Sequence, residues 1–92
     1  MRIFKDASGR EWRASARQLD GPDYKGRFYM VIEPAAGGDG PVLELPEVRW
    51  NSERTARRTL ETMSVFELRR RLRWAQDRVA AWSAGRGAVS AA

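Results

Sequence analysis

The sequence predicts an α+β domain in which a four-stranded antiparallel meander packs against a C-terminal two-helix hairpin. In residues 1–50, short apolar segments are separated by turn-forming Gly, Pro and Asp residues. In residues 51–92, the apolar spacing changes to the three and four of a helix. The length of 92 residues allows one small hydrophobic core and no second domain.

Residues 2–17 are typical of a β-hairpin. Its turn has Asp6 in the first position and Gly9 in the fourth, which is the chemistry of a type I turn closed by a left-handed glycine. After the turn, residues 11–17 alternate, with Trp12, Ala14 and Ala16 on one side and polar side chains on the other. Period two over seven residues indicates a half-buried strand.

Two further strands are expected at residues 27–33 and 42–45. The first is rich in aromatic and β-branched residues and is ended by Pro34. The second is limited by Pro46, which cannot donate to a ladder and therefore favours a sheet edge or an exit from the sheet. Turns at residues 20–23 and 35–41 make the connections.

The first helix is expected to start after Asn51 or Ser52 as N-cap and to end near Thr62. A capping box predicts the start of helix two, with Ser64 as N-cap and Glu67 at the third helical position. It is expected to run from residue 65 to about residue 82.

Apolar residues of helix two recur at positions 65, 68, 72, 75, 79 and 82, which places them on one stripe. We expect this stripe to lie across the sheet. The predicted core consists of Phe4, Trp12, Phe28, Met30, Ile32, Val42, Leu45, Leu60, Leu68, Leu72, Ala75 and Val79. The folded domain is expected to span residues 1–82. Residues 83–92, rich in Ala, Gly and Ser, are expected to form a disordered tail.

Composition excludes several kinds of chemistry. The chain has no Cys, which rules out disulfides, thiol catalysis and Cys-ligated metals, and no His, which removes the commonest general base. No complete catalytic, metal or cofactor motif is present, so we expect a protein that is not an enzyme and binds no cofactor. With neither a signal peptide nor an apolar run long enough for a bilayer, we expect a cytoplasmic protein without membrane contact.

The excess positive charge lies entirely in the second half of the chain. Residues 1–50 carry eight basic and eight acidic side chains, whereas residues 51–92 carry nine arginines and four acidic residues. A one-sided basic segment is typical of a protein with a polyanionic partner. A GC-rich genome, which favours Arg at ordinary solvated positions, would produce the same bias.

The face of helix two opposite its apolar stripe carries aromatic residues interleaved with arginines. We therefore predict a binding module that engages nucleic acid or a nucleoprotein complex, with arginines on phosphates and aromatics as stacking platforms or anchors. The predicted partner-binding residues are Arg54, Arg57, Arg58, Phe66, Arg70, Arg73, Trp74 and Arg78.

Two alternatives use the same aromatics differently. Phe66 and Trp74 would anchor an acidic protein partner if the chain is a regulator, an adaptor or a homodimer. They would instead be buried against helix one or a loop if helix two is covered on two sides.

Overall fold

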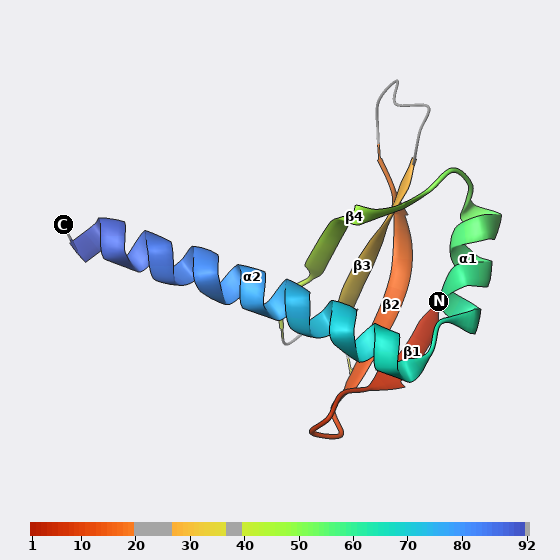
Figure 1. Ribbon diagram of the computed structural model, residues 1–92, viewed down its shortest axis with the longest axis horizontal. Coiled ribbons are helices and arrows are strands. Elements are labelled where there is room, and N and C mark those ends of the chain that lie inside the picture. The colour runs from red at the N-terminus through yellow and green to blue at the C-terminus, as the bar shows by residue number, and fades with distance from the viewer. Residues whose placement is uncertain (20–26, 37–39, 92) are drawn as a thin grey trace.

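The computed structural model describes residues 1–19, 27–36 and 40–91, with side chains as far as residue 81. The predicted α+β fold is confirmed: a four-stranded antiparallel sheet is followed by two helices that pack against it (Figure 1). The strands are β1 (Arg2–Lys5), β2 (Glu11–Gln18), β3 (Phe28–Pro34) and β4 (Leu43–Trp50), and the helices are α1 (Glu53–Thr62) and α2 (Val65–Ala91).

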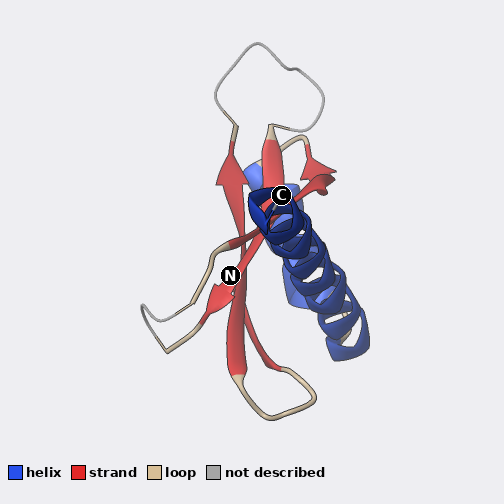
Figure 2. Cartoon of the chain, turned by 90° about the vertical axis from the view of Figure 1, so that its left-hand side faces the viewer, coloured by secondary structure: helices blue, strands red, loops and turns tan. Residues whose placement is uncertain are grey.

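The sheet is a simple meander with strand order β1-β2-β3-β4 and antiparallel neighbours throughout. Seen roughly along α2, both helices lie on one side of this sheet, and none of the described residues forms a helix on the other side (Figure 2). The chain therefore has a two-layer architecture, with the hydrophobic core between sheet and helices.

The β1–β2 turn has the predicted chemistry. Gly9 has φ +90°, a left-handed conformation that glycine adopts without a steric penalty. One carboxylate oxygen of Asp6 accepts hydrogen bonds from the backbone amides of Ser8 (2.9 Å) and Arg10 (3.0 Å). The other accepts from the indole Nε1 of Trp12 at 2.9 Å, so Asp6 also positions a core side chain.

Strand β4 continues through Pro46 but loses its register there. Tyr29 lies opposite Arg49, whereas the next β3 residue, Met30, lies opposite Leu45. Residues 46–48 therefore have no partner in β3 and form a bulge. Proline has no amide hydrogen for the ladder, which is the physical reason for an interruption at this point of an edge strand.

The core is built from the covered face of the sheet and one stripe from each helix. In α2, Leu68, Leu72 and Ala75 are at most 2% exposed. In α1, Ala56 and Leu60 are buried. The facing sheet residues are Phe4, Trp12, Ala14, Met30, Ile32, Leu43, Leu45 and Trp50.

Two predicted core residues are wrong, and a third is only partly buried. Val42 is 43% exposed because it precedes β4, and Leu43, which shares a strand face with Leu45, is buried in its place. Val79 is 42% exposed, although it follows the stripe of α2, because the last buried residue of that stripe is Ala75. Phe28 packs against the core from a partly buried position.

Helix α2 extends beyond the sheet toward the C-terminus (Figure 1). It ends at Ala91, past the predicted end of helix two near residue 82.

The open face of the sheet is covered by paired charges. Arg13 of β2 and Glu33 of β3 form an ion pair at 3.0 Å, and Glu44 accepts from Arg17 at 3.4 Å and from the Tyr29 hydroxyl at 3.2 Å. Val31, on this face, is only 1% exposed. Long side chains with apolar stems can shield such a residue, which explains how it is buried without a second helical layer.

The predicted turn at residues 20–23 lies outside the described residues, as do residues 37–39 of the predicted turn at 35–41.

Substitution of Leu72 by Asp is expected to abolish cooperative folding. The side chain is 2% exposed, so the substitution buries an unpaired charge and costs about 4 kcal/mol or more. Val79→Asp, on the same stripe but 42% exposed, is the matched control and is expected to cost about 1 kcal/mol or less. Urea unfolding followed by circular dichroism measures both; a native transition in Leu72→Asp would contradict the packing of α2.

Candidate nucleic-acid interface

Side-chain caps fix where each helix begins. The Ser52 hydroxyl accepts from the Thr55 amide at 3.2 Å, and the Ser64 hydroxyl accepts from the Glu67 amide at 3.1 Å, as predicted for both N-caps. The second half of the capping box is replaced. The Glu67 carboxylate binds the Nε of Arg71 at 3.0 Å instead of returning to the cap residue.

Two arginines join the helices to β1. The Nε of Arg69 donates to the carbonyl of Lys5 at 2.8 Å, and Nη1 of Arg2 donates to the carbonyl of Glu61 at 2.9 Å, in the last turn of α1. These bonds connect residues more than fifty positions apart in the sequence. The Arg69 bond joins α2 to β1, and the Arg2 bond joins α1 to β1. Which side chains of α2 face outward follows from its buried stripe, Leu68, Leu72 and Ala75.

The predicted outer face of α2 is exposed. Phe66 is 79% exposed and is the most exposed large hydrophobic side chain among the described residues, and Trp74 is 45% exposed. The alternative in which both aromatics are buried against helix one or a loop is therefore wrong for Phe66 and fails to account for the exposed half of Trp74. In sequence they are eight residues apart, which is about 12 Å along a helix axis.

The indole ring of Trp74 is in cation–π contact with two arginines, Arg70 and Arg71. The guanidinium carbon of Arg70 lies 4.7 Å from the centre of the indole ring, and that of Arg71 lies 5.5 Å from it. Cation–π attraction favours this arrangement. Glu67 lies beside both cations, at 3.9 Å from Arg70 and 3.0 Å from Arg71. Arg70 is therefore held in a stack on the helix surface instead of extending freely into solvent.

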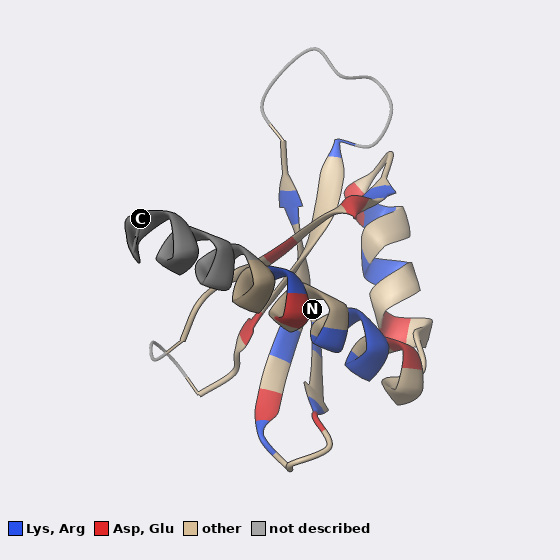
Figure 3. Cartoon of the chain, turned by 60° about the vertical axis from the view of Figure 1, so that its left-hand side comes forward, with Lys and Arg blue, Asp and Glu red and all other residues tan. Residues whose placement is uncertain are grey.

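The predicted arginines fall into two groups by their surroundings. Arg54, Arg58 and Arg73 are exposed, and their side chains form no ion pair or hydrogen bond with any described residue. Arg57 is paired with Glu53 one turn earlier at 3.0 Å. Lys and Arg positions, coloured blue on the cartoon of Figure 3, occur on α1 and on the first half of α2.

Arg78 lies apart from this group, against the bulge of β4. Its Nη2 and Nη1 bind the two carboxylate oxygens of Glu47 at 2.5 Å and 3.3 Å. The hydrogen bond from Arg78 lowers the pKa of Glu47 below its ordinary value, and the same bond raises the pKa of Arg78. This bidentate pair attaches α2 to the sheet edge, a role that the sequence did not indicate.

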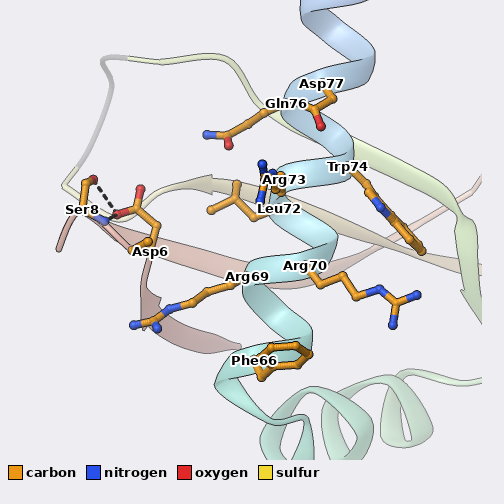
Figure 4. Close-up of a pocket in the computed structure, with 11 residues that line it drawn as sticks. Asp6, Ser8, Phe66, Arg69, Arg70, Leu72, Arg73, Trp74, Gln76 and Asp77 are labelled. Carbon is orange, nitrogen blue, oxygen red and sulfur yellow. Dashed lines mark hydrogen bonds between the residues drawn. The ribbon is translucent and has the colours of Figure 1, made fainter.

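A shallow open depression of about 900 Å³ surrounds the outer side of α2 and reaches the β1–β2 turn. Figure 4 shows its two sides: Arg69 and Gln76 point toward Asp6 and Ser8, whereas Arg70 and Trp74 point the opposite way. Arg69 was not among the predicted site residues. The signal for it was available, since it lies three residues after Phe66 and so on the neighbouring part of the helix surface.

Family models, curated proteins and solved structures offer no significant match to this chain. In the described ranges, no helix is long and apolar enough to cross a bilayer, and no three acidic, His or Cys side chains are grouped as metal ligands.

The β1–β2 turn is expected to weaken in acid. Side-chain hydrogen bonds from Ser8 and Trp12 lower the pKa of Asp6 from 3.8 to about 2. A folded-state pKa below the unfolded value means that ionised Asp6 stabilises the fold above about pH 4, and that this stabilisation is lost as the pH falls toward 2. The melting temperatures of wild type and Asp6→Asn should therefore differ at neutral pH and converge near pH 2. A constant difference over this range would contradict the assignment.

Proposed function

We propose that this chain is a non-enzymatic binding module that engages nucleic acid, alone or within a nucleoprotein, through the outer surface of α1 and the first half of α2. The observation that carries the proposal is the presence of unpaired cations on this surface. Arg54, Arg58 and Arg73 have no carboxylate partner within the described residues. On the open sheet face, by contrast, Arg13 and Arg17 are both paired with glutamates.

An unpaired guanidinium is suited to a phosphate ligand. It offers a planar set of donors that matches phosphate geometry, and it has no internal ion pair to break before binding. Each phosphate it neutralises releases counterions from the nucleic acid, which supplies affinity at low salt. The net charge of residues 51–92, nine arginines against four acidic residues, attracts a polyanion toward this half of the chain.

Nucleic-acid binding is expected to depend steeply on salt. Three phosphate contacts give a log–log slope of about −2 on a single strand and about −3 on a duplex, so affinity should fall about 20- to 40-fold between 50 and 200 mM salt. Fluorescence anisotropy of labelled oligonucleotides measures the slope. Absence of binding at 50 mM salt would contradict the proposal.

The triple variant Arg54→Gln, Arg58→Gln, Arg73→Gln is expected to lose most of this binding and most of its salt dependence, since each lost phosphate contact reduces the slope by about 1. The matched control is Arg13→Gln, Arg17→Gln, Arg49→Gln, which removes the same charge from the other face of the sheet. If both triples weaken binding equally, net charge alone is responsible and α1 and α2 do not form the interface.

A second candidate function is supported by Phe66. An apolar ring that is 79% exposed, one helical turn before Arg69 and Arg70, also resembles the centre of a protein interface, with an acidic protein or a second copy of the chain as partner. Such a complex would be weakened only modestly by salt. Sedimentation velocity tests the homodimer directly: concentration-dependent association that is lost in Phe66→Ala would favour it, and a monomer at all concentrations would exclude it.

A further inference from the structure

We infer that the nucleic acid bound by this surface is single-stranded, with Phe66 and the Arg70–Trp74 stack as two positions for unpaired bases. The inference rests on the proposed function and goes beyond it by naming the form of nucleic acid. It starts from the aromatic side chains, which phosphate binding alone does not explain.

Phe66 presents a ring that is 79% exposed among the described residues, one helical turn before Arg69 and Arg70. An apolar ring gains from contact with another planar apolar surface. Among polyanions, nucleic acid has such surfaces in its bases. In a duplex these faces are stacked on one another and inaccessible, whereas in a single strand they are free to stack on aromatic side chains.

The Arg70–Trp74 stack provides a platform of a second kind. The guanidinium of Arg70 lies 4.7 Å from the indole centre, close to a neighbouring carboxylate of Glu67 at 3.9 Å. A guanidinium plane held in this way is itself a surface on which bases stack, and it carries a positive charge for the adjoining phosphate. Arg70 therefore contributes without leaving its indole partner.

The arrangement along α2 suits a strand that follows the helix. Phe66 and Trp74 are separated by about two helical turns, or about 12 Å, which makes them separate platforms. Figure 4 shows Phe66 at one end of the group, with Arg70 and Trp74 extending to one side of the helix. Arg73, which lines the same depression and has no carboxylate partner among the described residues, is available for the backbone between them.

The test compares one labelled single strand of about 16 nucleotides with the duplex formed by the same strand and its complement, by anisotropy at low salt. We expect the single strand to bind at least about tenfold more tightly. Phe66→Ala and Phe66→Leu should each weaken single-strand binding about five- to tenfold or more, because both remove the ring. Leucine keeps an apolar side chain, so it separates stacking from general apolar contact.

Val79→Ala is the control, because Val79 is exposed on α2 but lies outside the depression. It should leave binding unchanged, and circular dichroism should show native spectra for all variants. Equal affinity for duplex and single strand, or full binding by Phe66→Leu, would overturn this inference while leaving the proposed function in place. Failure of both nucleic acids to bind at low salt would overturn the two together.

Discussion

The packing of the α2 stripe on the covered face of the meander is the interaction on which the rest of the structure depends. Leu68, Leu72 and Ala75 are buried against a sheet that has no second helical layer to stabilise it. A chain of 92 residues has room for one hydrophobic core. The free energy lost when a charge is buried in that core cannot be offset by a second core elsewhere. The same contact that stabilises the sheet also orients the opposite face of α2 toward solvent. The arginines on that face are therefore placed when the domain folds.

Polar contacts also attach α2 to the sheet near both ends of its buried stripe. Arg69 on the Lys5 carbonyl and Arg78 on Glu47 hold α2 at two points, and the Ser64 cap sets where it begins. These polar contacts are partly exposed and contribute modest stability individually. They join α2 to β1 and to the bulge of β4 in the orientation that its buried stripe requires. An arginine-rich helix can thus use some of its cations to orient itself and leave others for a ligand.

Local patterns in the sequence were sufficient for most of the fold. The alternation of Trp12 and Ala14 and the cap at Ser64 each depend on a few neighbouring residues, and both are confirmed. The errors arose where tertiary context decides. The spacing of α2 places Val79 on the buried stripe, but the sequence of α2 does not indicate where the sheet beneath the helix ends, so the exposure of Val79 was not predicted. Likewise, the pairing of Arg78 with Glu47 joins residues 31 positions apart through a bulge that the sequence did not predict.

The bulge at residues 46–48 also affects how the molecule can assemble. An unbroken outer strand offers a row of free amides and carbonyls that can recruit a strand from another chain. In β4 this row is interrupted by Pro46 and by the two residues after it, and in β1 the carbonyl of Lys5 is already bound by Arg69. Both edges of the sheet therefore present an interrupted row of backbone groups, which weakens each as a template for strand exchange.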